Sequence, residues 1–375
     1  YLSKQDRAFM TRLVDGTIEY MLQLDYIIDS FSKTKVRKMK PFIRNLLRMS
    51  VYQIKYMDAV PDSAVCNEAV KLAKRHKFAQ LSGFVNGVLR NIARNIDSVQ
   101  FDTLSIRYSM PQWIVDRFVA AYGEKKAEEI FKAFHNKSTI SIRTNLTRCT
   151  PDELRATLEA EGVTVTAVDE LNYAFVISGF DYLNGLQSFR DGLFYVQDIS
   201  SMLVAQTAAP KKGDYVIDVC AAPGGKSTHI AELLQGSGHV LARDLTDNKV
   251  DMIEENIERH GLNNMSAEVW DATVPDADSA GKADILICDL PCSGLGVLGR
   301  KKDIRYKMTP ESVDELAALQ RQILDTVHTY VKPNGVLVYS TCTIDEAENE
   351  DNVRWFIEKH PEFELDKNFA EGTGM

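Results

Sequence analysis

The sequence predicts a multidomain protein: an all-α bundle, then a small α+β module, then an α/β doubly wound domain. Apolar residues recur at helical spacing through residues 1–135, short alternating runs begin at Ser138, and strands alternate with helices from Asp214 onward. A chain of 375 residues is long enough for two to three domains. We therefore place the domains at residues 1–135, 136–200 and 201–375.

The first 135 residues predict a bundle of helices. Pro41 suits the first turn of one of them, because proline has no backbone N–H to lose there. The apolar positions that carry the helical spacing are Phe9, Leu13, Ile18, Met21 and Leu22; Ile43, Leu46, Leu47, Val51 and Ile54; and Phe84, Val88, Leu89 and Ile92.

Charge is distributed unevenly along the chain. The net charge is −9, but residues 1–100 carry 17 Lys and Arg against 9 Asp and Glu. Between Ser30 and Met57 there are eight basic residues and no acidic one, which is typical of a face that binds a polyanion. A solvated basic helix is the alternative interpretation. The candidate contacts are Lys35, Arg37, Lys38, Lys40 and Arg44.

The connecting module is predicted from a change of pattern after Ser138. The runs Thr139–Asn145 and Tyr173–Ile177 alternate as strands do, and Pro151–Glu161 between them is helical. The segment Gly192–Gln197 then leads into a helix that begins after Asp198.

The third domain shows the repeated order of a parallel sheet covered by helices on both faces. Ligands bind such sheets at the carboxyl ends of the strands, so the residues that follow each strand are the place to look for chemistry. The predicted strands are Tyr215–Val219, His239–Ala242, Ala267–Trp270, Ile285–Cys288 and Val336–Ser340, and the helices are Lys226–Leu234, Asp247–His260, Pro310–Val331 and Glu346–His360.

Composition excludes several classes of protein. Six cysteines without a C-x-x-C pair indicate reduced thiols and no metal site. No apolar run approaches the length of a membrane span, and the N-terminal segment is charged, so we expect a cytoplasmic protein without membrane contact. The first residue, Tyr1, and an incomplete hairpin after a possible strand at Phe363–Leu365 suggest that both natural ends are missing.

A glycine loop after the first strand of the sheet predicts a nucleoside-cofactor site. A phosphate loop is disfavoured, because its first glycine would fall on Cys220 and Pro223 interrupts it. Asp244 ends the second strand, where a carboxylate can accept ribose hydroxyls, and Asp271 follows the third strand near an adenine edge. Either aspartate alone is also a common turn residue. The loop residues are Cys220, Ala221, Ala222, Pro223, Gly224, Gly225 and Lys226.

Two cysteines and an aspartate follow the next two strands, in Asp289-Leu-Pro-Cys292 and Thr341-Cys342-Thr343. Together with Cys220–Lys226, these segments resemble the signatures of the S-adenosylmethionine-dependent RNA 5-methylcytosine methyltransferases, the NOL/NOP/Sun family. Asp6-Arg-Ala-Phe9 and Phe84–Arg90 are similar to NusB, a helical RNA-binding fold. The combination resembles the bacterial members of the family that act on 16S rRNA.

This resemblance implies a Rossmann-like methyltransferase domain and a role for each residue. Cytosine C5 is too weak a nucleophile to take a methyl group directly, so a thiolate must first add to C6. The resemblance assigns this attack to Cys342, the release of product to Cys292, and a hydrogen bond at N3 to Asp289. It also places S-adenosyl-L-methionine at Ala221–Lys226, Asp244, Asp271 and Asp289. Arg243 departs from the family pattern, in which an apolar residue is commoner.

Other functions remain open from the residues. A tRNA cytosine-C5 methyltransferase would share the chemistry, and a non-catalytic RNA-binding factor would share the fold. The basic run Arg300–Lys302 with Arg305 is either an RNA-contacting loop or a solvated charge run. We expect a monomer whose partner is 16S rRNA.

Overall fold

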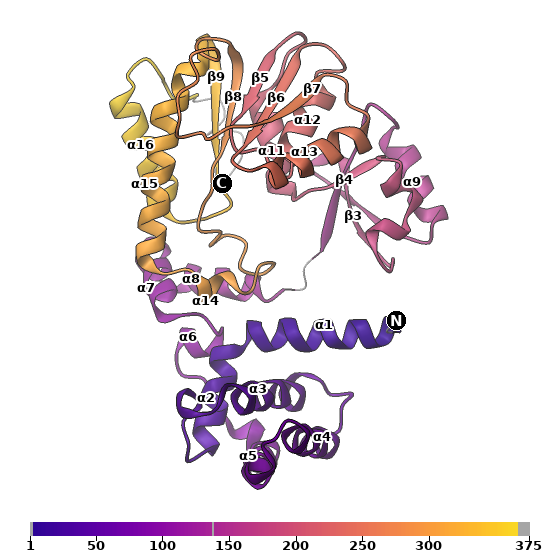
Figure 1. The fold of residues 1–375 in the computed structure, drawn as a ribbon, viewed down its shortest axis with the longest axis vertical. Helices are drawn as coiled ribbons and strands as arrows, with labels where there is room; N and C mark the ends of the chain where they lie inside the picture. The colour runs from indigo at the N-terminus through magenta and orange to yellow at the C-terminus, as the bar shows by residue number, and fades with distance from the viewer. Residues whose placement is uncertain (1–2, 137–138, 367–375) are drawn as a thin grey trace. The chain divides into compact units, whose positions relative to one another are not determined.

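The computed structural model describes residues 3–136 and 139–366 (Figure 1). The chain divides into two compact units. The first, called the helical unit, comprises Tyr1–Asn136 together with Val297–Thr309. The second, called the sheet unit, comprises Lys137–Gly296 and Pro310–Met375. No helix within the described residues is both long enough and apolar enough to span a bilayer.

The helical unit confirms the predicted bundle. Its core is formed by fully buried aliphatic side chains of α2, α3 and α5, such as Ile27, Leu47 and Leu89. Pro41 occupies the first turn of α3, as predicted. The helices are α1 (Lys4–Glu19), α2 (Met21–Phe31), η1 (Val36–Lys38), α3 (Pro41–Tyr56), α4 (Asp62–Arg75), η2 (Ala79–Leu81), α5 (Ser82–Asn95), η3 (Ile96–Ser98), α6 (Leu104–Arg107), α7 (Gln112–Tyr122), α8 (Glu124–Phe134) and α14 (Ile304–Lys307).

The segment Val297–Thr309 belongs to the helical unit, and both expectations for its basic residues are wrong for Arg305 and Lys302. The Arg305 side chain is fully buried and donates to the carbonyl oxygens of Glu19 at 3.3 Å and Leu298 at 3.0 Å. Lys302 forms an ion pair with the Glu19 carboxylate at 2.6 Å. Lys302 is therefore neutralised by a carboxylate, and Arg305 is bound by carbonyl oxygens inside the unit, so neither serves as a free surface cation.

The sheet unit begins with a four-stranded antiparallel sheet in the order β2-β3-β1-β4. Ile142, Leu154 and Phe194 are fully buried between this sheet and α9. The predicted strands and helix are confirmed, and two further strands complete the sheet. Its elements are β1 (Ile140–Thr144), α9 (Pro151–Ala160), β2 (Thr164–Val168), β3 (Leu171–Ser178), η4 (Leu183–Gly185), α10 (Gln187–Arg190) and β4 (Phe194–Val196).

A five-stranded parallel sheet follows, in the order β7-β6-β5-β8-β9, and confirms the doubly wound prediction. One face packs against α11, α12 and α13, and the opposite face packs against α15 and α16 (Figure 1). The elements are α11 (Ile199–Ala208), β5 (Tyr215–Asp218), α12 (Gly225–Leu233), β6 (His239–Asp244), α13 (Asp247–His260), β7 (Met265–Val269), β8 (Ala283–Asp289), α15 (Pro310–Val327), η5 (His328–Tyr330), β9 (Val331–Ser340), η6 (Glu346–Glu348) and α16 (Glu350–Lys359).

The parallel register aligns the strand ends that carry the predicted chemistry. Asp289, the last residue of β8, pairs with Ser340, the last residue of β9. Asp218 ends β5 and Asp244 ends β6, so these strands finish at the same edge of the sheet. The possible strand at Phe363–Leu365 is wrong, because these residues lie outside every strand.

Candidate active site

The glycine loop links the ends of two neighbouring strands. The backbone N–H of Ala221 donates to the Arg243 carbonyl at 2.8 Å, and that of Ala222 donates to the Asp244 carboxylate at 2.9 Å. Gly224 has φ of +100°, a conformation that residues with a side chain rarely adopt. The chain then enters α12 at Gly225, so the first N–H groups of this helix open onto the loop.

Asp244 is almost fully buried and is well placed to accept hydrogen bonds. Besides Ala222, its donors are the Leu245 N–H at 2.8 Å and the Lys249 ammonium at 2.7 Å. A carboxylate has about four acceptor positions, so these contacts leave room for a further hydroxyl donor. Lys249 is half-exposed, and a bound ribose can replace its contact.

Asp218 ends β5 just before this loop, and Cys220 is the first residue of the loop. Burial raises the pKa of Asp218 to about 7, although the Ser227 hydroxyl donates to its carboxylate. Burial also raises the pKa of the Cys220 thiol, which disfavours the thiolate. Cys220 is therefore a poor nucleophile. Sequence reasoning missed Asp218, although its position as the last residue of β5 was a usable signal.

Asp271 and Arg243 both make local structural contacts. Asp271 is exposed beyond the end of β7, and its carboxylate accepts from the Thr273 N–H and hydroxyl at 2.8 and 2.7 Å. Those bonds lower its pKa. Arg243 is buried and forms ion pairs with Glu268 and Asp276, each at 2.6 Å. Arg243 therefore holds β6 to β7, which explains why an arginine is tolerated beside Asp244.

Asp289 joins the glycine loop to the edge of β9. Its carboxylate forms an ion pair with Lys226 at 2.6 Å and accepts from the Ser340 hydroxyl at 2.8 Å. The side chain of Asp289 is 29% exposed, which leaves it accessible at the strand ends. Lys226 therefore pairs with the charge of Asp289 in addition to lining the glycine loop.

The two predicted cysteines meet beside this carboxylate. Cys292 and Cys342 lie with their sulfur atoms 3.2 Å apart, and the Cys342 N–H donates to the Cys292 sulfur at 3.3 Å. Cys342 is exposed, whereas Cys292 is half-buried. The hydrogen bond between the two thiols, followed by burial, raises the pKa of Cys292, whereas the Cys342 N–H lowers it. Cys292 therefore keeps its proton, and its thiol can donate to a Cys342 thiolate.

The basic segment lies in the helical unit, around η1 and the start of α3. Lys35, Arg37, Lys38 and Lys40 are exposed, and Arg44 is half-buried. Arg48, in the same run, instead forms an ion pair with Asp25 at 2.6 Å. The exposed members present positive charge to solvent.

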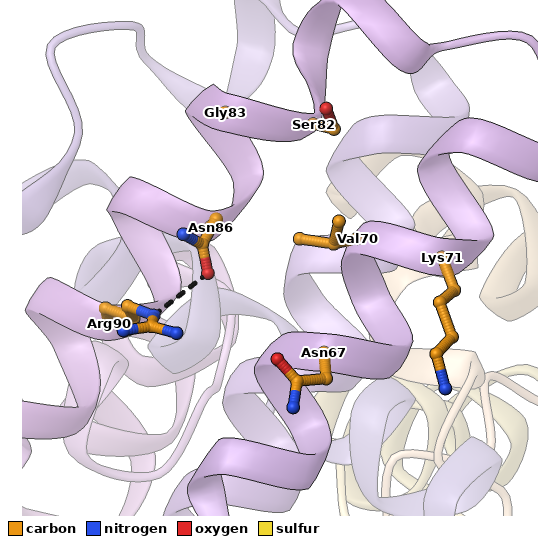
Figure 2. Close-up of a pocket in the computed structure, with 7 residues that line it drawn as sticks. All are labelled: Asn67, Val70, Lys71, Ser82, Gly83, Asn86 and Arg90. Atoms are coloured by element: carbon orange, nitrogen blue, oxygen red, sulfur yellow. Dashed lines mark hydrogen bonds between the residues drawn. The ribbon is translucent and has the colours of Figure 1, made fainter.

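Figure 2 shows a separate hollow of about 480 Å³ between α4 and α5. Arg90 donates to the Asn86 side chain at 3.1 Å, and Lys71 forms an ion pair with Glu68 at 2.6 Å. The cations of this hollow thus have partners within the protein, and the predicted RNA-binding residues do not line it. Its lining residues are Asn67, Val70, Lys71, Ser82, Gly83, Asn86 and Arg90.

A group with metal-ligating side chains lies elsewhere in the sheet unit. Ligand atoms of Asp325, His328 and His360 lie within 4.8 Å of one another. Asp325 is also paired with Lys359 at 2.7 Å. Since His328 begins the turn that leads into β9, the group lies at the amino end of that strand, opposite to the cysteine pair. That the protein functions without a metal ion stays a prediction.

A parallel sheet in the order β7-β6-β5-β8-β9, with a glycine loop and acidic strand ends at its carboxyl edge, defines a Rossmann-like methyltransferase. The chain belongs to the RsmB/F family of ribosomal RNA small subunit methyltransferases. Three protein-family models match the chain. The family described as 16S rRNA methyltransferase RsmB/F matches residues 205–375, and the NusB family matches residues 1–94. The RsmF/B-like ferredoxin-like domain matches residues 110–180. The resemblances to the methyltransferase family and to NusB are confirmed.

Relatives and solved structures support this assignment. The probable ribosomal RNA small subunit methyltransferase B of Bacillus subtilis is 39% identical over 97% of this chain and 83% of its own length. Its counterpart in Synechocystis is 34% identical over 96% of this chain and 83% of its own length. The crystal structure of PH0851 covers 96% of this chain and 83% of its own, with a TM-score of 0.82 and 26% identity. NSun6 from Pyrococcus horikoshii with SFG covers 66% of this chain and 87% of its own, with a TM-score of 0.60 and 25% identity.

Proposed function

We propose that this protein transfers a methyl group from S-adenosyl-L-methionine to C5 of a cytosine in 16S rRNA. The observation that carries the proposal is the pair of thiols, Cys292 and Cys342, with sulfur atoms 3.2 Å apart. Both follow strands that end beside Asp289. Methylation at an exocyclic nitrogen or a ribose hydroxyl needs no such pair. The names of the curated relatives agree with a ribosomal RNA substrate.

The two cysteines divide the chemistry between them. The thiolate of Cys342 adds to C6 of the unstacked cytosine, which makes C5 nucleophilic. The Asp289 carboxylate accepts a hydrogen bond from N3 once this nitrogen has gained a proton during the addition. Once C5 carries the methyl group, its proton passes to a water molecule as the C6–sulfur bond breaks, and Cys342 leaves as a thiolate. Cys292, which keeps its proton, assists this release by donating a hydrogen bond to that thiolate.

The residues of the glycine loop fit a nucleoside cofactor. Buried Asp244 has an acceptor position free for a ribose hydroxyl, and Gly224 and Gly225 leave the backbone open to close approach. S-adenosyl-L-methionine supplies an electrophilic methyl group when bound. SFG, which accompanies the NSun6 structure, is an analogue of this cofactor. Exposed Asp271 lies at the outer margin of the site.

We assign the three predicted domains to separate tasks. Residues 1–135 bind RNA through Lys35, Arg37, Lys38, Lys40 and Arg44. Residues 136–200 connect the other two domains, and residues 201–375 catalyse methyl transfer. The protein works in the cytoplasm as a monomer, without a metal.

Replacing Asp244 by alanine is expected to weaken cofactor binding at least about tenfold, because a charge-assisted hydrogen bond contributes about 1.5–3 kcal/mol. Titration calorimetry with S-adenosyl-L-methionine measures the effect. Asp251→Ala, an exposed acid on α13, is the matched control. Unchanged affinity in the Asp244 variant would remove this residue from the site.

Reversing the charge of Lys35, Arg37 and Lys38 to glutamate is expected to weaken RNA binding by the full chain. Since each phosphate contact releases counterions, the slope of log affinity against log salt should also fall by roughly 2 for a single strand. The control reverses Lys125, Lys126 and Lys132, exposed cations of α8. Equal losses in the two variants would return the basic segment to the interpretation as a solvated helix.

The proposed function is tested with 16S rRNA that carries tritium at C5 of its cytosines. Methylation at C5 must release one tritium for each methyl group transferred, whereas methylation at a nitrogen or ribose oxygen releases none. A tRNA transcript labelled in the same way tests the alternative substrate. Methyl transfer without tritium release would refute the proposal, and release from tRNA alone would replace the substrate.

A further inference from the structure

Two consecutive residues, Glu348 and Asn349, each bind a different cysteine-bearing loop. We call residues 290–296 the Cys292 loop and residues 341–345 the Cys342 loop. The first follows β8 and the second follows β9, whereas Glu348 ends η6 and Asn349 immediately precedes α16. This dipeptide is therefore placed to relate the two loops to each other.

Glu348 holds the Cys292 loop. Its carboxylate accepts from the Ser293 N–H at 2.9 Å and also from the Ser293 hydroxyl. The Gln320 amide bridges the Glu348 carboxylate and the Pro291 carbonyl, with both distances 2.9 Å. The residues on both sides of Cys292 are thus fixed. Glu348 and Gln320 are fully buried, so water does not compete for these bonds.

Asn349 holds the Cys342 loop in the same way. Its amide nitrogen donates to the Thr343 carbonyl at 3.1 Å, and its amide oxygen accepts from the Thr341 hydroxyl at 2.6 Å. These two threonines flank Cys342. The hydroxyls of Thr343 and Ser293, 2.9 Å apart, join the two loops directly.

Burying a carboxylate among neutral donors costs desolvation energy, and an apolar contact would hold two loops at less cost. What the polar arrangement adds is direction, because each hydrogen bond fixes the distance and angle of a particular backbone group. None of the bonds of Glu348 and Asn349 given above goes to either sulfur. Their effect on the thiols passes through the loop backbone.

We propose that Glu348 and Asn349 are positioning residues that set the distance between the two thiols. The division of roles rests on the proposed function: Glu348 places Cys292 for product release, and Asn349 places Cys342 for attack on C6.

The assignment predicts different failures for two neighbouring substitutions. Glu348→Gln should slow turnover at least tenfold and accumulate a covalent protein–RNA complex, as expected for loss of Cys292. Asn349→Ala should lose turnover to a similar extent without forming that complex. Ser293→Ala, a smaller change in the same loop, should resemble Glu348→Gln more weakly. Glu346→Gln, an exposed acid of the same turn, is the control and should behave as wild type.

A reagent for paired thiols tests the positioning without RNA or cofactor. Phenylarsine oxide forms two arsenic–sulfur bonds with a close pair of thiols, and its oxygen leaves as water with the two thiol protons. The wild-type full chain should bind it, Cys292→Ala and Cys342→Ala should not, and Glu348→Gln and Asn349→Ala should bind at least tenfold more weakly. Cofactor affinity and the melting temperature, measured alongside, should stay near those of wild type.

Wild-type arsenical binding by both Glu348→Gln and Asn349→Ala would overturn the positioning role, as would the same covalent-complex behaviour in both variants. If the arsenical results agree with expectation but the wild-type protein releases no tritium from cytosine C5, the positioning stands and the proposed function fails.

Discussion

Replacing Cys342 by alanine is expected to reduce methyl transfer to 16S rRNA by at least about 10³-fold, because no adduct at C6 can form without this thiolate. The affinity for S-adenosyl-L-methionine and for RNA should be unchanged, since Cys342 lies outside the glycine loop and the basic segment. Incorporation of labelled methyl groups measures the loss. Cys149→Ala, which removes a half-buried thiol far from the strand ends in sequence, should keep full activity.

Full turnover by the Cys342 variant would contradict the assignment of the nucleophile. In that case the exposed position of Cys342 and the raised pKa of Cys292 would need another explanation.

Replacing Arg143 by methionine is expected to destabilise the sheet unit by about 3–5 kcal/mol, because one partner of a buried ion pair is left uncompensated. The guanidinium is fully buried and binds Glu232 at 2.8 Å, Gln197 at 2.6 Å and the Gly225 carbonyl at 2.9 Å. It therefore ties β1 to the first turn of α12. Urea unfolding, followed by the fluorescence of the sheet unit, measures the change.

The double variant Arg143→Met/Glu232→Leu is the control for this interpretation. Replacing both charges with apolar side chains removes the unpaired carboxylate, so most of the lost stability should return. A double variant as unstable as Arg143→Met would show that packing, and not the buried charge, determines the effect.

The fold was predictable because its signals are local. The helical spacing around Leu47 and Leu89 and the apolar runs of β5 and β8 each reflect the burial of one face or one strand. The order of a doubly wound sheet then places Asp289, Cys292 and Cys342 at one edge, because parallel strands end together. Strand β2 was missed because its sequence, TVTAV, is largely exposed and shows no alternating burial.

The parts that could not be predicted depend on partners distant in sequence. Arg305 belongs to a basic run whose sequence is typical of an exposed loop, yet its side chain is buried. It can be buried because the carbonyl oxygen of Glu19, 286 residues earlier, accepts a hydrogen bond from it. In the sequence, Glu348 resembles the exposed acidic residues around it, and only the fold brings it to Ser293, 55 residues earlier. Tertiary structure thus decides which charged residues are structural, and no local pattern marks them.

The central claim is that Cys342 forms the covalent bond and Cys292 helps to break it. Denaturing electrophoresis of Cys292→Ala, incubated with 16S rRNA and S-adenosyl-L-methionine, tests this most directly. The account predicts a stable protein–RNA complex, attached through Cys342 in the mass spectrum and absent from the Cys292→Ala/Cys342→Ala variant. Normal turnover by Cys292→Ala without such a complex, or a complex formed through Cys292 in the Cys342→Ala variant, would contradict it.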